Sequence, residues 1–313
     1  MYLTLGGAFI KIATTTGDFK LYCQNDIERI NELNKAGFKY IDLDMYSFTP
    51  DSPYMKDDWK SAVLALENEA DKLGMKFVQA HSQGGNPLDG NQDKVDFLVA
   101  ATIRSIEICD MLGIKNTVVH PGFAKGISKE EWFEKNCTFY KKLVPSMEKF
   151  GVNVLIENST SANMGDRYFA NSGADMSEFL KFVDHPLLHA CWDTGHANCE
   201  GSQYNDIITL GKELFAIHYN DNHGAKDEHL IPFFGTLNHD EVINALIDSK
   251  FEGYFTLECS SSLIPKNYWL GGRRSFDGNA QLAEPQLFMQ QQVVTLMYSI
   301  AKYMLTAYDI FEE

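Results

Sequence analysis

Cysteine is scarce in this sequence, which has six cysteines in 313 residues and no C-x-x-C pair. In a chain of this length, scattered cysteines argue against a disulfide framework and for reduced thiols, so we expect a cytoplasmic protein. The six positions are Cys23, Cys109, Cys137, Cys191, Cys199 and Cys259.

Long apolar runs and an excess of basic residues are also missing. No stretch approaches the roughly 20 consecutive apolar residues that cross a membrane, and the first twenty residues lack the basic and apolar regions of a secretion signal. Acidic residues number 43 against 27 basic ones, for a net charge of −16. Because a negative surface repels phosphate backbones, the charge argues against nucleic-acid binding. The missing apolar run argues against membrane association.

Short apolar runs alternate with helical patterns along the whole chain. The runs predict strands at 3–8, 40–45, 76–81, 116–120, 152–157, 187–193, 214–220 and 253–258. Helices are predicted near 26–36, 58–73, 91–112, 129–150, 175–183, 203–212, 238–249 and 285–309. Eight such units predict an α/β fold with a parallel sheet, a single (β/α)8 TIM barrel over 1–313. A doubly wound open sheet is the alternative, but its glycine fingerprint for dinucleotides is missing.

Six consecutive predicted strands carry a residue type that binds metals at or near their ends. In a (β/α)8 barrel these ends gather at one rim, which is where the chemistry takes place. The six residues are His81, His120, Glu157, Asp193, His218 and Glu258. The loops that follow add His196, Asp227 and His229. Converging carboxylates would repel one another without a cation, so we expect a metal site rather than a solvated acidic rim. Carboxylates and imidazoles without thiolate favour Zn²⁺ or Mn²⁺, with Co²⁺ or Mg²⁺ as further options.

Five motifs resemble the xylose isomerase-like TIM-barrel superfamily, which holds sugar and sugar-phosphate isomerases and epimerases and the endonuclease IV-type AP endonucleases. They are VVHPG (118–122), LIEN (155–158), WDTGHA (192–197), IHYNDN (217–222) with DEHLIPFFG (227–235), and TLEC (256–259). In the epimerase branch the resemblance implies one divalent ion held by four residues, of which the two glutamates also form the acid–base pair. They are Glu157, Asp193, His218 and Glu258.

The endonuclease branch implies a three-zinc cluster instead. It would add five ligands, and all nine positions carry a matching residue type here. The five are His81, His120, His196, Asp227 and His229. Since members of the epimerase branch often keep some of these histidines, both branches stay open.

Several residues are predicted to bind substrate. His120 and His196 would orient hydroxyl groups. In the loop that follows Asp227 and His229, the superfamily commonly has Pro-Gly-Glu-Gly, but here Phe233 and Phe234 replace the Gly and the Glu. Together with Trp192, these two aromatic side chains could cover the apolar face of a sugar. The only basic cluster near the rim holds Arg273 and Arg274, which could bind the phosphate of a sugar phosphate, as barrel loops near the seventh and eighth strands often do.

The sequence therefore predicts a divalent-metal-dependent sugar or sugar-phosphate isomerase or epimerase that transfers a proton through a metal-stabilised enediolate. The first alternative is an endonuclease IV-like metallo-phosphodiesterase with a multinuclear zinc site. Lyases and dehydratases of small polyhydroxy acids could use related chemistry, and a non-catalytic carbohydrate-binding barrel is an alternative of another class. The apolar stretch in 285–309 is either the last barrel helix or the face of a homo-oligomer.

Overall fold

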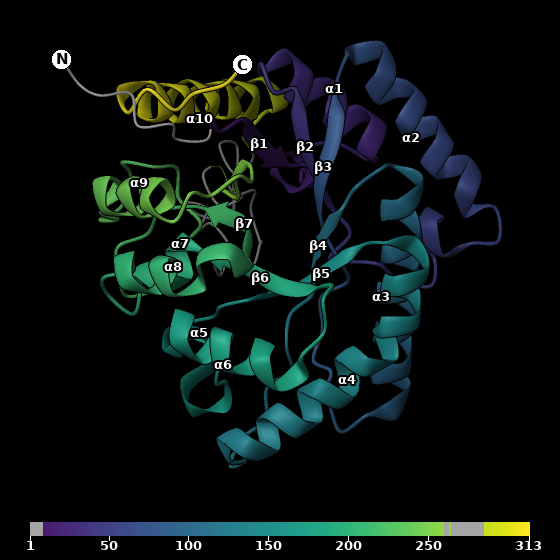
Figure 1. The fold of residues 1–313 in the computed structure, drawn as a ribbon. Helices are drawn as coiled ribbons and strands as arrows, with labels where there is room; N and C mark the ends of the chain where they lie inside the picture. The colour runs from purple at the N-terminus through teal and green to yellow at the C-terminus, as the bar shows by residue number, and fades with distance from the viewer. Residues whose placement is uncertain (1–8, 260–262, 264–284) are drawn as a thin grey trace, which may run out of the picture.

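The computed structural model of the chain describes residues 9–259, 263 and 285–313. Eight parallel strands close into a barrel in sequence order, and the helices surround it (Figure 1). The strands are β1 (Ile12–Thr15), β2 (Tyr40–Asp44), β3 (Lys76–His81), β4 (Asn116–Val118), β5 (Asn153–Glu157), β6 (Leu188–Asp193), β7 (Leu214–Tyr219) and β8 (Phe255–Leu257). The predicted (β/α)8 barrel is thus confirmed.

Barrel closure depends on the pairing of β1 with β8, in which Ala13 lies opposite Thr256. The strand predicted at 3–8 falls outside the described residues, and the first barrel strand is Ile12–Thr15. All four of its residues are buried, as expected for a strand that is covered on both sides.

The barrel's outer layer consists of helices that pack their apolar faces on the strands. They are α1 (Asp26–Lys35), α2 (Trp59–Leu73), α3 (Gln92–Met111), α4 (Lys129–Phe150), α6 (Gly173–Val183), α8 (Tyr204–Leu210), α9 (His239–Asp248) and α10 (Leu287–Ala307). Ser128 and Glu131 form a capping box at the start of α4. None of the helices in the described ranges combines the length and apolar character of a membrane span.

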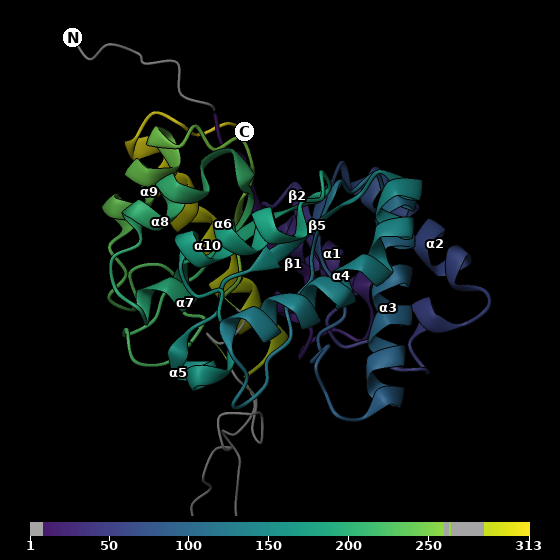
Figure 2. The same ribbon diagram turned by 60° about the horizontal axis from the view of Figure 1, so that its bottom comes forward.

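Short elements crowd the carboxyl-terminal end of the barrel. The turn η1 (Thr16–Phe19) follows β1, α5 (Ser161–Met164) follows β5, and α7 (Thr194–Asn198) follows β6. Figure 2 shows α5 at one end of the molecule and the C-terminus at the other. The C-terminal segment returns to the opposite rim, where Phe311 bridges to Ile10. The rim with the short elements is the one that carries the predicted ligands.

Candidate metal centre

Strand alternation places the predicted ligands inside the barrel. Leu155, Cys191 and Ala216 form a buried apolar cluster with Val118. Each of the first three is followed two residues later by a polar residue on the same face of its strand. These polar residues are Glu157, Asp193 and His218, all at most 2% exposed. They form the floor of the site, directly above the apolar interior.

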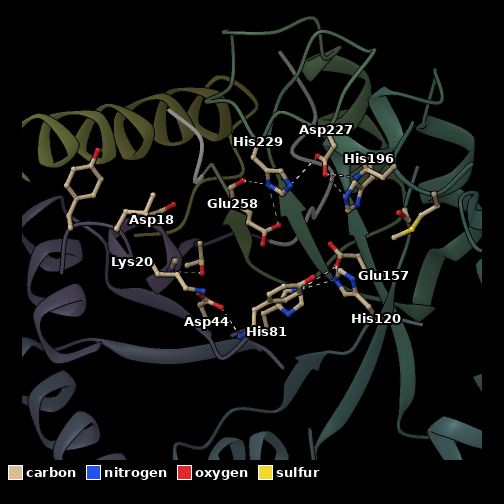
Figure 3. Close-up of a pocket in the computed structure, with 18 residues that line it drawn as sticks. Asp18, Lys20, Asp44, His81, His120, Glu157, His196, Asp227, His229 and Glu258 are labelled. Atoms are coloured by element: carbon tan, nitrogen blue, oxygen red, sulfur yellow. Dashed lines mark hydrogen bonds and ion pairs between the residues drawn. The ribbon is translucent and has the colours of Figure 1, made fainter. Parts of the chain in front are cut away.

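A cavity of about 300 Å³ opens above this floor at the carboxyl-terminal rim (Figure 3). Seven of the nine predicted ligands line it, and Asp193 and His218 lie beneath it. The seven are His81, His120, Glu157, His196, Asp227, His229 and Glu258. The structure therefore brings together residues from six strands that are up to 177 positions apart in the sequence.

Four residues form the group that the resemblance implies for a single ion. Glu157, Asp193, His218 and Glu258 each offer a ligand atom, and these atoms lie within 4.8 Å of one another. His218 Nδ1 lies 2.7 Å from Glu157 Oε1 and 3.3 Å from Glu258 Oε2. The side chain of Glu157 is 2% exposed and that of Glu258 is 24% exposed, so Glu258 is the more accessible of the two carboxylates from the cavity.

The neighbours of Asp193 orient its carboxylate. Asn220 Nδ2 donates to Asp193 Oδ2 at 2.8 Å, and the backbone N–H of His196 donates to Oδ1 at 2.6 Å. The second bond makes Asp193 the N-cap of α7. An apolar strand thus ends on a carboxylate because that carboxylate both starts a helix and faces the site.

The opposite nitrogen of His218 faces a polar group deeper in the barrel. Gln79 Nε2 lies 2.9 Å from His218 Nε2 and donates to Asp42 Oδ2 at 2.6 Å. Asp42 Oδ2 is itself 3.5 Å from His218 Nε2. Such outer partners fix the ring orientation of a metal-binding histidine.

Two further groups of potential ligands adjoin the first. One combines His81, Glu157 and His218, with His120 Nε2 2.6 Å from Glu157 Oε2. The other holds Asp227 between His196 and His229, at 3.1 Å from the first and 3.2 Å from the second (Figure 3). Glu157 and His218 each belong to two of the three groups, so these two groups overlap.

The donor set and its electrostatics fit a divalent cation. His81 Nε2 and His120 Nε2 lie only 3.0 Å apart, and His196 Nδ1 is buried without a hydrogen-bond partner. Burial disfavours protonation of His196, but Asp193 and Asp227 outweigh it and raise its pKa to about 10. The carboxylates of this site therefore attract positive charge strongly, and imidazole with carboxylate is a ligand set for Zn²⁺ or Mn²⁺.

The surroundings shift the pKa values of the two glutamates of the floor in opposite directions. Burial opposes ionisation of Glu157, but His218 and His120 hold its pKa well below the usual range. Burial raises the pKa of Glu258 despite His218 and His229, and the charge of Glu157 raises it further. Two carboxyl groups with pKa values that their surroundings separate are typical of acid–base sites.

Of the predicted substrate-binding residues, His120 and His196 line the cavity. The structure does not bring Trp192 there: it is one residue out of phase with Asp193, so it faces the helix layer, fully buried, and donates to Gln203 Oε1 at 2.9 Å. Phe233 and Phe234 do not line it either. They are 55% and 56% exposed, and Phe233 packs on His239 with ring centroids 4.5 Å apart. Arg273 and Arg274 lie outside the described residues.

The first two strands contribute cavity residues that we did not predict. Asp18, Lys20, Asp44 and Tyr46 all line the cavity. Asp44 ends β2 and could have been found, because it has the same phase as the ligands at the ends of later strands. Burial raises the pKa of Asp18 to about 8, although the hydrogen bond from Thr14 Oγ1 lowers it.

Comparison with known proteins places the chain in a family. A profile of the xylose isomerase-like TIM barrel matches residues 30–283. The uncharacterised protein MJ1311 of Methanocaldococcus jannaschii is 27% identical over 180 residues, which cover 55% of this chain and 60% of that protein. The probable endonuclease 4 of Aquifex aeolicus is 27% identical over 192 residues, covering 57% and 62%. The chain thus matches about three fifths of the length of these two relatives.

The fold is also found in solved structures. The D-psicose 3-epimerase of Clostridium cellulolyticum H10 superposes with a TM-score of 0.72 at 18% identity, covering 95% of this chain and 99% of that one. Identity this low is informative about the fold alone. With the match of the family profile to most of the chain, it follows that this protein belongs to the xylose isomerase-like TIM-barrel family.

Proposed function

We propose that the protein is a divalent-metal-dependent isomerase or epimerase of a sugar or sugar phosphate. The observation that carries the proposal is the pair Glu157 and Glu258, which approach His218 Nδ1 from two different strands at the floor of the cavity. The solved sugar epimerases of the same fold support it.

The two glutamates would move the proton. Glu157 ends β5 and Glu258 follows β8, so a substrate lying between them presents one face to each carboxylate (Figure 3). One glutamate removes the proton from the carbon next to the carbonyl. The other returns a proton to the opposite face, which gives the epimer, or the proton passes to the neighbouring carbon, which gives the isomer.

The ion would be held by Glu157, Asp193, His218 and Glu258. When bound there, a divalent ion supplies a Lewis acid that polarises a carbonyl and stabilises negative charge on oxygen. Zn²⁺ or Mn²⁺ suits the donor set best. His120 and His196 would orient substrate hydroxyls from the cavity wall, and the closed strand layer below excludes water from the floor.

A second candidate is a multinuclear zinc phosphodiesterase, which is favoured by one specific observation. His196, Asp227 and His229 form a separate ligand group beside the first, and Glu157 is shared by two groups. Against it, Lys20 is the only lysine or arginine among the described cavity residues, and it is paired with Asp44. A nucleic-acid substrate needs several phosphates neutralised. A third candidate function is carbohydrate binding without catalysis.

The test is proton exchange between solvent and a bound ketose. The metal-reconstituted protein is incubated in D₂O with a panel of ketoses, ketose phosphates and glycosylated ketoses, and ¹H NMR records loss of the proton next to the carbonyl. We expect exchange and a new epimer or isomer with one of them, and neither with Glu258→Gln. Binding of sugar without exchange would favour the non-catalytic barrel, and cleavage of a phosphodiester without exchange would favour the second candidate.

A further inference from the structure

A second cavity adjoins the metal centre on the outside of the barrel. It also measures about 300 Å³ and lies between the first turn of α1, α2 and the loop after β2. We call it the α1–α2 cavity. Its wall includes Asn25, Arg29, Phe48, Ser52, Tyr54 and Ala62.

One ion pair separates the two cavities. Lys20 and Asp44 line both of them. Lys20 Nζ donates to Asp44 Oδ2 at 3.0 Å and to Ser47 Oγ at 2.9 Å. The side chain of Lys20 is a third exposed, so it forms a ridge between the cavities that a bound molecule could cross and contact with its oxygen atoms.

The wall of the α1–α2 cavity is neutral overall. Lys20 is paired with Asp44, and Arg29 Nη1 lies 2.7 Å from Asp26 Oδ1. No other lysine, arginine, aspartate or glutamate lines it within the described ranges. Because both cations are already compensated, the cavity suits a neutral polar molecule better than a phosphate.

The wall is also held in place before anything binds. Tyr54 Oη donates to Asp26 Oδ2 at 2.8 Å, and Arg104 Nη1 donates to the Tyr54 carbonyl at 2.8 Å. The rings of Phe48 and Tyr54 pack at a centroid distance of 5.6 Å and are mostly buried. Aromatic surface beside Asn25 and Ser52 gives apolar and polar contacts together, which is what a sugar ring requires.

We propose that the α1–α2 cavity binds a second sugar unit, so that the substrate is a neutral ketose glycosylated far from its carbonyl rather than a free monosaccharide or a sugar phosphate. The reacting ketose lies over Glu157 and Glu258, and the second sugar lies across the Lys20 ridge. This assignment of the substrate class rests on the proposed isomerase or epimerase function.

Three probes separate the alternatives: D-fructose, D-fructose 6-phosphate, and isomaltulose, which is fructose with glucose on O6. Their affinities are measured by calorimetry on the metal-loaded and on the chelator-treated protein. Ala62→Leu fills the α1–α2 cavity, and Ser61→Leu is the matched control because Ser61 is exposed on the same helix and does not line the cavity. We expect isomaltulose to bind at least about tenfold more tightly than fructose, and Ala62→Leu alone to remove the difference.

A second measurement does not depend on any variant. Saturation-transfer NMR on the wild-type protein should show the glucosyl protons of isomaltulose saturated as strongly as the fructosyl protons. Equal affinity for fructose and isomaltulose, tighter binding of the phosphate, an unchanged Ala62→Leu variant or unsaturated glucosyl protons would each overturn the proposal.

The two proposals fail in different ways. Proton exchange on a free ketose with no preference for isomaltulose leaves the proposed function in place and removes the second sugar site. Selective binding of isomaltulose without proton exchange would leave the second sugar site in place and remove the proposed isomerase or epimerase function.

Discussion

Replacing Asn220 with alanine tests whether the partners of Asp193 set the affinity of the metal centre. Asn220 is fully buried, and its amide donates to Asp193 Oδ2 at 2.8 Å. Without that bond the carboxylate of Asp193 loses one of the two hydrogen bonds that orient it toward the other three proposed ligands. Loss of an outer partner typically lowers metal affinity 10- to 100-fold, which corresponds to about 1.4–2.8 kcal/mol.

The assay is competition between the protein and a chromogenic chelator for Zn²⁺ and for Mn²⁺. Asn244→Ala is the matched control, because Asn244 is exposed on α9, where its amide donates to the Asp240 carbonyl at 2.7 Å. Urea unfolding of the chelated proteins measures the effect on the fold separately. Metal affinity of Asn220→Ala equal to that of the wild type and of Asn244→Ala would refute the reasoning.

Two further predictions concern residues outside the proposed ligand set. Asp18 has its pKa raised by burial to about 8, so between about pH 4 and pH 8 the native state holds a proton that the unfolded state has released, and stability falls as pH rises. Asp18→Asn should remove this contribution, and urea unfolding at pH 5 and pH 8 compares the slopes; parallel slopes would contradict the assignment. Trp192→Phe should cost about 1–3 kcal/mol of unfolding free energy, because Gln203 loses its buried partner. Calorimetry should find sugar affinity unchanged, whereas a sugar contact of Trp192 would appear as weakened binding.

The architecture of the protein could be predicted because the alternation of strands and helices is regular over most of the chain. The fold class and the family are confirmed. The gathering of the ligands followed from the same pattern, since parallel strands in a closed barrel must end at one rim. His81, Glu157 and Asp193 are the last residues of their strands, as predicted.

The direction of side chains was harder to predict than the position of residues along the chain. Trp192 precedes Asp193 on β6, so strand alternation already puts the two on opposite faces, and this would have excluded Trp192 from the cavity. The direction of Phe233 and Phe234 depends on how their loop folds back on His239. The spacing of residues in the sequence does not determine how this loop packs against His239.

The cavity residues that follow the first strand were not predicted, for a different reason. Asp18 and Lys20 lie on and just after a one-turn 3₁₀ helix that begins directly after β1, so neither is in phase with a strand end. The sequence pattern also predicted the first strand at 3–8, whereas β1 is Ile12–Thr15, so no strand end was expected next to this turn. The assignment of Arg273 and Arg274 to phosphate binding remains a prediction outside the described residues.

We propose that the rim binds a catalytic divalent ion through Glu157, Asp193, His218 and Glu258. The most direct test is the number of metal ions per chain in the chelator-washed and reconstituted protein, counted by native mass spectrometry and compared with Asp193→Ala. We predict one tightly held ion that Asp193→Ala loses; three zinc ions would extend the site to His81, His120, His196, Asp227 and His229 and favour the phosphodiesterase. A wild-type protein that retains no ion at any Zn²⁺ or Mn²⁺ concentration tested would contradict the account.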